Sequence, residues 1–379
     1  MDTRSERARV PQPIETPSRA IALLVALLLV TATPRSASAQ DSHYWSEQYG
    51  TRAALLGGTV IGSVVDLSAV YYNPGAVALN PDAGFILSAR AYRQGTITIE
   101  DGAGEGEDLA STSTRPIATL LATPLDFDFL GRHQLVYSVL TRQQFGTEVL
   151  TYRIDEQDYL PAPGNEDFAG AYRGGASMRE TWTGVTWAYP LSDRLGIGVS
   201  PYLALRSREL KSQFLVQAST EAGDVGSAIR LRTRRFSNWR ALAKMGVSYQ
   251  SERLSLGVTA TTPSLSLTGS GLASYNESIT SSDLTPAFID EPYLAANVQP
   301  DLSATFKSAW VVGGGAGILL GGTRLHASAE WFQAPDPFVA LDADGVGPLA
   351  VLLHEDPRPR RRIGIGALHP VLDERGRDV

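Results

Sequence analysis

Several segments of the chain alternate apolar residues with small or polar ones, and ionisable side chains recur at the small or polar positions. These side chains are the groups that could hold a charged ligand. They are Arg206, Lys244, Arg324, His326, Glu330 and Arg362. An arginine in such a row suits a carboxylate, because the two form charge-assisted and often bidentate pairs. The alternative is a lattice of ion pairs that braces a polar interior, and Arg324 with His326 and Glu330 fits such a lattice.

Arrangements that would support catalysis are not found. The chain has no cysteine, which excludes a thiol nucleophile, a thiolate metal site and a disulfide framework. It also lacks the G-x-S-x-G, H-E-x-x-H and phosphate-loop patterns. A hydrolase would need a serine and a histidine in reach of each other, and no motif nominates any of the five histidines. We therefore expect no enzyme activity, no cofactor and no metal.

Composition narrows the class of partner. The net charge is -7, charged residues make up 19% of the chain, and 36 residues are glycine. A broad basic surface is the usual electrostatic basis of nucleic-acid binding, so this composition argues against a nucleic-acid partner.

The N-terminus resembles a secretory signal. Four arginines within the first 19 residues precede an unbroken apolar run at 20–30, and Ala37-Ser38-Ala39 follows as a small-residue cleavage site. A membrane anchor is the alternative, but the run is shorter than the ~20 apolar residues that a spanning helix needs. We expect residues 1–39 to be removed near Ala39 and the rest to lie outside the cytoplasm.

Period-two alternation follows the signal along most of the chain. At 254–261 the residues Leu254, Leu256, Val258 and Ala260 share one face of a strand, while small or polar residues share the other. A second such segment at 244–250 is joined to it by a short polar turn, which predicts a hairpin. Ten strands are predicted in this way, at 83–92, 115–122, 134–143, 184–189, 195–206, 244–250, 254–261, 310–318, 325–331 and 362–368.

The spacing of these strands favours a transmembrane β-barrel over a soluble sandwich. Tight turns follow residues 189, 250 and 320, and they alternate with long connections at 143–177, 207–235, 263–305 and 333–361. Outer-membrane barrels have short turns on one side and long loops on the other. Trp187, Tyr189 and Tyr249 lie beside tight turns, where an interfacial girdle would place them; rings filling a sandwich core are the alternative. Such a sheet must close, because lipid cannot satisfy an open backbone edge.

The segment before the first strand carries the most specific pattern. Gly50, Arg52, Ala53, Gly57 and Gly58 are followed by Ser68-Ala69-Val70-Tyr71-Tyr72-Asn73-Pro74. This order resembles the N-terminal segment of the FadL/TodX family of outer-membrane transporters of hydrophobic compounds. The pattern departs from the family at Gly75-Ala76, which reverses the family's Ala-Gly.

The resemblance implies that residues 40–82 are a hatch inside a barrel formed by residues 83–379, with Arg52, Gly57, Gly58, Tyr71, Tyr72, Asn73 and Pro74 as its motif. Small residues allow close backbone approach, and Pro74 fixes the turn. An ordinary periplasmic lead-in is the alternative for this segment.

The function implied is passive uptake of hydrophobic small molecules, such as long-chain fatty acids, through the outer membrane of a Gram-negative bacterium. Expected partners are the substrate, outer-membrane lipid and, during biogenesis, the barrel-assembly machinery, with the protein as a monomer. Phe214, Leu215 and Val216, and Phe288, Ile289 and Tyr293, are candidates for capture in outer loops, although packing within the loop would also explain them. A structural or secretion-associated barrel without transport is the alternative.

The number of strands departs from the family, whose barrel has about fourteen. Ten strands are an even number that could close alone. The chain stops at a predicted turn without a terminal aromatic residue, and we expect a C-terminally truncated copy.

Overall fold

The computed structural model describes residues 47–81, 84–104, 107–127, 129, 131–158, 164–281, 293–333, 338–343, 351–353 and 360–368. The helices are α2 (Thr51–Leu55), α3 (Ala69–Tyr72) and α4 (Pro74–Val77). The strands are β1 (Ile86–Gly104), β2 (Glu107–Pro124), β3 (Gln134–Gln157), β4 (Glu166–Ser192), β5 (Leu195–Ser219), β6 (Val225–Gln250), β7 (Leu254–Thr261), β8 (Leu265–Ser281), β9 (Tyr293–Ser303), β10 (Val311–Leu320), β11 (Thr323–Phe332), β12 (Phe338–Leu341), β13 (Val351–Leu353) and β14 (Arg360–Leu368). The predicted signal segment lies outside the described residues.

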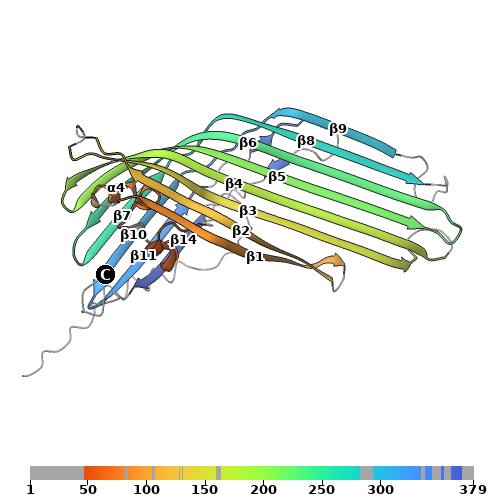
Figure 1. Ribbon diagram of the computed structural model, residues 1–379, viewed down its shortest axis with the longest axis horizontal. Coiled ribbons are helices and arrows are strands. Elements are labelled where there is room, and N and C mark those ends of the chain that lie inside the picture. Colours follow the sequence, from red (N-terminus) through yellow and green to blue (C-terminus); the bar gives the residue numbers. More distant parts are fainter. Residues whose placement is uncertain are drawn as a thin grey trace, which may run out of the picture. The chain divides into compact units, whose positions relative to one another are not determined.

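One antiparallel sheet contains most of these strands (Figure 1). Its path runs β1-β2-β3-β4-β5-β6-β7-β10-β11-β14, and β8 and β9 branch from β6. The branch arises because β6 is long enough for two partners: its 244–250 part pairs with β7, and its 226–241 part pairs with β8. The ten predicted strands are the ten strands of this path, so that part of the prediction is confirmed.

Three of the four predicted long loops, however, are wrong, and the fourth, at 333–361, lies largely outside the described residues. Residues 144–157 and 166–177 extend β3 and β4, residues 207–219 and 225–235 extend β5 and β6, and most of 263–305 forms β8 and β9. Strand β4 alone has 27 residues. The error has a physical cause: where both faces of a sheet meet water, the apolar alternation that reveals a strand in the sequence is no longer required.

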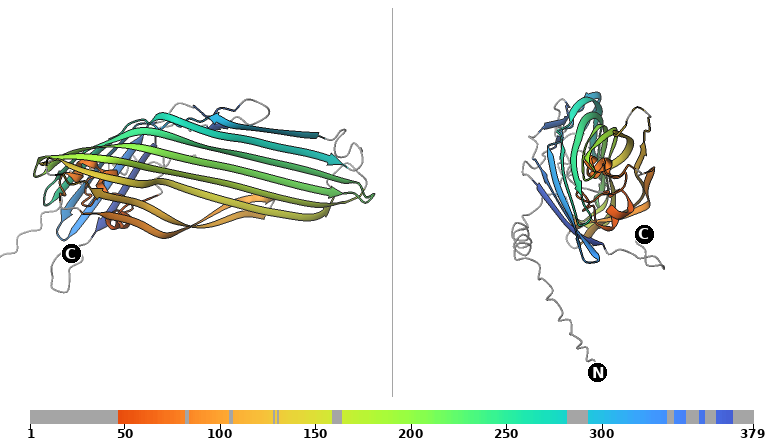
Figure 2. Two further views of the ribbon diagram at one scale, coloured as in Figure 1. Left: turned by 45° about the horizontal axis from the view of Figure 1, so that its top comes forward. Right: turned by 90° about the vertical axis from the view of Figure 1, so that its left-hand side faces the viewer.

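The sheet curls around the hatch region (Figure 2). Within the described residues β1 and β14 pair with β2 and β11 respectively, and not with each other. The predicted all-β, antiparallel architecture is therefore confirmed, and the sheet is strongly curled. The predicted closure into a complete ring is not present in the described part of the chain.

Outward positions of this sheet are mostly apolar, whereas inward positions carry small, polar and charged side chains together with the apolar ones that contact the hatch region. In β7, Ser255, Gly257 and Thr259 are buried, whereas Leu256 and Val258 are 42% and 60% exposed. In β6 every even-numbered residue from Phe236 to Ser248 is buried. Directly opposed residues share a face, so register carries this parity from strand to strand. The arrangement is the reverse of a water-soluble sheet protein.

Aromatic residues border this outward apolar band. Trp239 on β6 and Trp331 on β11 lie at one border, each about two-fifths exposed. Tyr189 and Trp187 lie at the turn side, where Trp187 Nε1 donates to His133 Nδ1 at 3.1 Å. From Trp239 to Tyr249 the band spans about eleven residues, the length of a membrane-crossing strand. Among the described residues, no helix has the length and apolar character needed to cross a membrane.

Beyond the band, the same strands continue as a distal extension, which we define as residues 144–157 of β3, 166–179 of β4, 207–219 of β5 and 225–237 of β6, with β8 and β9. About 13 residues at ~3.3 Å each give it a reach of roughly 40 Å. In Figure 1 these strands run on together to the right, away from the end of the sheet where α4 lies.

The outward apolar band predicts that a charged substitution lowers the free energy of unfolding by an amount that depends on its position along the strand. Val258→Arg should reduce the free energy of unfolding in lipid vesicles by about 2–4 kcal/mol, the usual cost of an arginine near the bilayer midplane. Thr233→Arg is the control, because Thr233 lies on the same outward parity but in the distal extension. Denaturant titration in vesicles measures both, and equal effects would contradict the assignment of the band.

Candidate functional site

The hatch, which we define as residues 47–81, packs on the inward face of the sheet. Its residues from Ala69 to Ala78 are almost completely buried, and α4 contacts β4, β5 and β6. A buried apolar cluster joins the hatch to inward residues of the wall, among them Leu120, Leu140 and Leu242. The hatch is therefore held by the sheet and has little core of its own.

Asn73 is the main polar link between hatch and wall, and it is fully buried. Its Oδ1 accepts from the Gly75 backbone N–H at 3.1 Å, which caps α4. Its Nδ2 donates to the carbonyls of Ile61 and Val247, each at 3.0 Å. Pro74 begins α4 at a position where the missing N–H costs nothing. One side chain thus fixes the turn, an earlier part of the hatch and strand β6.

Glycines on the wall make the close contact possible. A Cβ on Gly246 would overlap Asn73 Oδ1, and one on Gly198 would overlap the carbonyl of Pro74. On the other side of the hatch, a Cβ on Gly257 would overlap the carbonyl of Ile61, and Gly62 faces the Gly315 backbone in the same way. The glycines of β5, β6, β7 and β10 therefore form a surface on which the backbone of the hatch rests directly.

Further hydrogen bonds hold the hatch along its length. Tyr202 Oη donates to the Val70 carbonyl at 2.7 Å, and Ser63 Oγ lies 2.6 Å from His326 Nδ1. Tyr49 Oη donates to the Thr141 carbonyl at 2.8 Å. Burial and neighbouring Tyr71 raise the pKa of Tyr49 well above its usual value, so this hydroxyl keeps its proton.

An aromatic layer covers the hatch on the side of the distal extension. Tyr71 packs edge-on against Tyr49 and Tyr72, with ring centroids 4.6 and 5.3 Å apart. Trp182 of β4 lies next to Tyr71, at 6.2 Å between centroids. Lys244 Nζ lies 4.8 Å from the Tyr71 centroid, a cation–π geometry.

Above this layer lies a buried charge cluster. Glu180 Oε2 is 2.9 Å from Arg206 Nη1 and 2.7 Å from Arg240 Nη2. Its Oε1 accepts from Trp182 Nε1 at 2.7 Å. Arg142 adds another buried cation, with its guanidinium carbon 5.7 Å from the Trp182 ring. Arg142, Arg206 and Arg240 thus surround one carboxylate.

The segment 304–309 closes over this cluster. It connects β9 to β10 and brings Phe306, which is 1% exposed, between two arginines. The guanidinium carbons of Arg206 and Arg240 lie 4.0 and 4.6 Å from its ring centroid. Asn238 Nδ2 holds the segment by donating to the Ala304 carbonyl at 3.0 Å.

A cavity of about 50 Å³ remains between the charge cluster and this segment. Arg142, Glu180, Arg206 and Arg240 give it a polar side, and Trp182, Leu242, Phe306 and Phe332 give it an apolar side. A water molecule takes ~30 Å³ of liquid volume, so the cavity has room for one acid group or one to two waters.

The structure separates the sequence-predicted polar residues into groups. Arg206 belongs to the charge cluster, and Lys244 lies near it, where it interacts electrostatically with Glu330. His326 binds the hatch through Ser63, whereas Arg324 donates to the Glu252 carbonyl in a turn, at 3.0 Å. Arg324 and Glu330 are six residues apart on β11, about 20 Å along a strand. The two side chains therefore make their contacts in different places.

The hatch motif residues also differ in their surroundings. Tyr71, Tyr72, Asn73 and Pro74 are buried together. Gly57 and Gly58 have φ values of 60° and 82°, a conformation that favours glycine. Arg52 is half-buried and near Arg324; burial and that second cation lower its pKa.

The residues predicted to capture ligand in loops are placed differently. Phe214, Leu215 and Val216 lie inside strand β5, so their placement in a loop was wrong. Tyr293 begins β9, and Phe288 and Ile289 lie outside the described residues.

Sequence reasoning missed Glu180, Arg240, Arg142 and Phe306. The first two carry a usable signal, because both continue the even-numbered inward parity of β4 and β6. Arg142 lies at a register shift between Thr141 and Gln143, where the period-two alternation of the strand is interrupted. Phe306 lies between strands, where no periodicity exists.

Comparison with known proteins gives a limited result. No family model and no characterised protein sequence matches the chain. Among solved structures, it is similar to the Pseudomonas putida toluene transporter TodX, with 9% identity, 87% of this chain and 98% of that chain covered, and a TM-score of 0.26. A mutant form of TodX, described as a monoaromatic hydrocarbon channel, gives 11% identity, 86% and 98% coverage, and a TM-score of 0.25.

Loss of the Asn73 amide should loosen the hatch. Asn73→Ala removes three hydrogen bonds and leaves buried carbonyls without a donor, so residues 47–81 should lose about 3 kcal/mol of protection against hydrogen exchange. Asn80→Ala is the control, because Asn80 Nδ2 bonds only the local Ala76 carbonyl among the described contacts, at 2.7 Å. Hydrogen exchange by mass spectrometry measures both; an unchanged Asn73→Ala exchange rate would refute the link.

The glycine wall predicts that one methyl group can displace the hatch. Gly246→Ala places a Cβ against Asn73 and Pro74 and should expose the hatch to exchange and proteolysis. In Gly314→Ala the nearest atom to the new Cβ is the Gly257 carbonyl oxygen at 3.8 Å, an ordinary contact, so the hatch should stay in place. Limited proteolysis of residues 47–81 distinguishes the two, and equal protection in both variants would show that close approach is not required.

Proposed function

We propose that the protein is an outer-membrane channel for the passive uptake of hydrophobic small molecules, of which long-chain fatty acids are the representative class. The observation that carries this proposal is the cavity at Glu180, Arg206 and Arg240, which combines an apolar wall with three arginines around one carboxylate.

The outward band supports a membrane location. Residues such as Val258, Val247 and Ile318 are two-fifths to three-fifths exposed, and together they form a belt bordered by aromatic rings. A belt of this kind would be unfavourable in water and is the lipid-facing surface of transmembrane barrels. The N-terminal pattern of a secretory signal and the resemblance of residues 48–79 to the FadL/TodX family agree with an outer-membrane location.

The inner cavity supports an acid group on the substrate. Three arginines lie around Glu180 on one side of the cavity, and arginine is the side chain that forms charge-assisted, often bidentate pairs with a carboxylate. Phe306, Leu242 and Phe332 lie on the opposite side and would contact the start of an alkyl chain. The volume suits the acid group alone, so passage of the whole molecule requires movement of the hatch or of segment 304–309.

The alternative is a barrel whose inner ion pairs serve only to hold the wall together. The geometry that favours it is the double ion pair of Glu180, which already links β4 to β5 and β6. Removing one partner of a buried pair usually costs about 3–5 kcal/mol, so a stability measurement alone does not separate the two functions. A transport measurement does separate them.

Flux through the full-length protein in lipid vesicles tests the proposal. Wild-type protein should carry dodecanoate across the bilayer down its gradient, faster than empty vesicles and without an energy source. Arg240→Gln should lower the dodecanoate flux about tenfold, because it removes a charge-assisted contact, and should leave dodecan-1-ol flux nearly unchanged. Arg179→Gln is the control, since Arg179 is exposed on the outward face beside Glu180.

The outcomes are distinct. Wild-type flux equal to that of empty vesicles, with a folded protein, would overturn the channel and leave the structural barrel. Equal losses in Arg240→Gln and Arg179→Gln would overturn the role of the inner cavity.

A further inference from the structure

We infer a lipid headgroup site on the outward face of the distal extension, where Arg173, Lys211 and Arg235 bind the phosphate groups of a glycolipid in the outer leaflet. The site is distinct from the inner cavity, because these three cations have outward parity whereas Arg206 and Arg240 have inward parity. The inference rests on the outer-membrane location in the proposed function, and it does not depend on which molecule the protein transports.

A polar zone follows the apolar band on the outward face of β4, β5 and β6. On β6 the band ends at Trp239, and the next outward residues are Ser237 and Arg235. The outward residues at the same level of the neighbouring strands also include no large apolar side chain, from 173 to 179 on β4 and from 207 to 213 on β5. The zone therefore presents charged, hydroxyl and amide groups to its surroundings.

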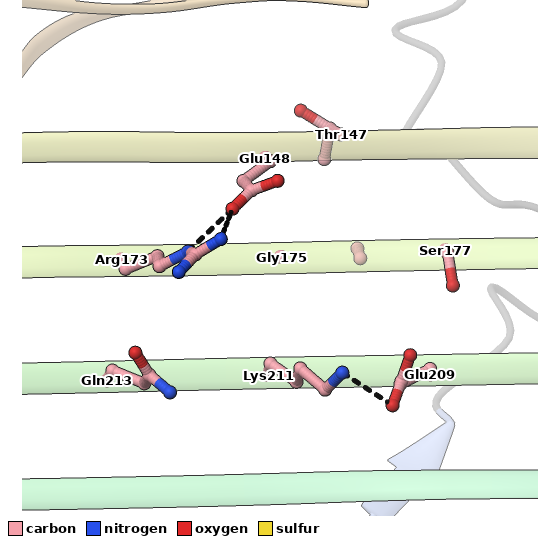
Figure 3. Close-up of a pocket in the computed structure, with 9 residues that line it drawn as sticks. Thr147, Glu148, Arg173, Gly175, Ser177, Glu209, Lys211 and Gln213 are labelled. Atoms are coloured by element: carbon pink, nitrogen blue, oxygen red, sulfur yellow. Dashed lines mark hydrogen bonds and ion pairs between the residues drawn. The ribbon is translucent and has the colours of Figure 1, made fainter. Parts of the chain in front are cut away.

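The zone contains a hollow of about 350 Å³ over Gly175 of β4. A Cβ at this position would meet no side chain within 4 Å, so the space above the glycine is open. Figure 3 shows two ion pairs beside it. Arg173 Nε donates to Glu148 Oε1 at 2.6 Å, and Lys211 Nζ lies 2.9 Å from Glu209 Oε1. More than half of the Arg173 and Lys211 side chains stays exposed, so their remaining N–H groups can contact a ligand in the hollow.

Three cations follow a diagonal line across the hollow. Lys211 of β5 lies directly between Gly175 of β4 and Thr233 of β6. Arg173 is two residues from Gly175, and Arg235 is two residues from Thr233 in the opposite direction along the strands, so both are diagonal neighbours of Lys211. Diagonal neighbours on one face lie roughly 7–8 Å apart. Two adjacent cations of this line can therefore contact the same phosphate group.

Cations outnumber carboxylates in this part of the outward face. The carboxylates beside the hollow are Glu148 and Glu209, and each already contacts one of the cations named above. Arg179 and Arg235 are two further exposed arginines on the outward face of β4 and β6. From β3 to β6 the zone therefore carries a surplus of two positive charges, which an anionic ligand with more than one phosphate group would balance.

The distance of the zone from the apolar band identifies the class of ligand. Arg235 is four residues beyond Trp239 on β6, and the register puts Arg173 level with Leu231, eight residues beyond Trp239. At ~3.3 Å per residue these positions are about 13 and 26 Å along the strand from the border of the band. With the band among the acyl chains, the zone lies at the level of the lipid headgroups, and the outer leaflet of an outer membrane presents a phosphorylated glycolipid there. Further out, exposed apolar residues such as Tyr152 return, so the zone has a far limit as well.

Site-specific fluorescence tests the headgroup site, because the chain has no cysteine and Ser177→Cys provides a single labelling position beside the hollow. Full-length protein with an environment-sensitive dye at that position is titrated in maltoside micelles with a diphosphorylated lipid A and with the same lipid after removal of its phosphates. The diphosphorylated lipid should shift the dye emission saturably. Combining Arg173→Gln, Lys211→Gln and Arg235→Gln should raise its half-saturating concentration at least about tenfold, because charge-assisted contacts are lost. The dephosphorylated lipid should bind weakly and show little dependence on the three cations.

Arg232→Gln is the matched control, because Arg232 lies on the same strand as Arg235 but has inward parity, and it should leave the titration unchanged. Glu209→Gln should act in the opposite direction: it removes a carboxylate from the zone and releases Lys211, so the half-saturating concentration should fall. Tighter binding of this kind does not follow from a loss of folding. A heat-modifiable gel shift confirms that each variant is folded.

The inference is overturned if folded protein gives no saturable shift with the diphosphorylated lipid, if the triple variant responds like Arg232→Gln, or if removal of the phosphates leaves binding unchanged. Inorganic phosphate should displace the lipid only at a far higher concentration. Displacement at the lipid's own half-saturating concentration would show a general anion site and overturn the assignment to a glycolipid.

The titration measures binding and not flux, so it separates this inference from the proposed transport. Phosphate-dependent binding in a protein that carries no dodecanoate would support the headgroup site and overturn the channel, whereas flux without such binding would support the channel and overturn the headgroup site.

Discussion

The parity of side chains along hydrogen-bonded strands is the constraint on which the structure depends. Each hairpin passes the inward or outward assignment of one strand to the next, because directly opposed residues share a face. From β4 to β7 this keeps Glu180, Arg206, Lys244 and Ser255 inside and outward residues such as Val247, Leu256 and Val258 outside. A shift of one residue in any pair would reverse both faces beyond it. The hatch, the charge cluster and the apolar band are therefore consequences of one register.

The hatch depends on that register in a second way. Its backbone rests on inward glycines contributed by four strands, and these glycines align only because the pairing brings them level: Gly198 is opposite Gly246, and Gly257 is opposite Gly315. The hatch is then fixed by a few polar groups such as Asn73 and Tyr202. The wall carries glycines where it contacts the hatch, and charged residues such as Arg206 and Glu180 lie next along the same face.

The sequence was sufficient for the features that follow from alternation and insufficient for those that do not. Alternation at 244–261 predicted the β6–β7 hairpin and the inward position of Lys244, because apolar residues there occupy every second position and face outward. The distal extension was predicted as loops, since segments such as 166–177 lack that apolar alternation. The partners of Arg206 depend on contacts across β4, β5 and β6, and Phe306 reaches them from a segment between strands. Contacts between segments that are far apart in the chain leave no local pattern in the sequence.

The length of the central strands has a consequence for encounter with the outside medium. Six strands share their hydrogen bonds over the distal extension, so it is a stiff arm and not a set of flexible connections. It reaches about 40 Å from the aromatic border of the band. In the outer-membrane channel proposed above, with this arm facing away from the cell, an approaching molecule would meet the arm before it met the bilayer.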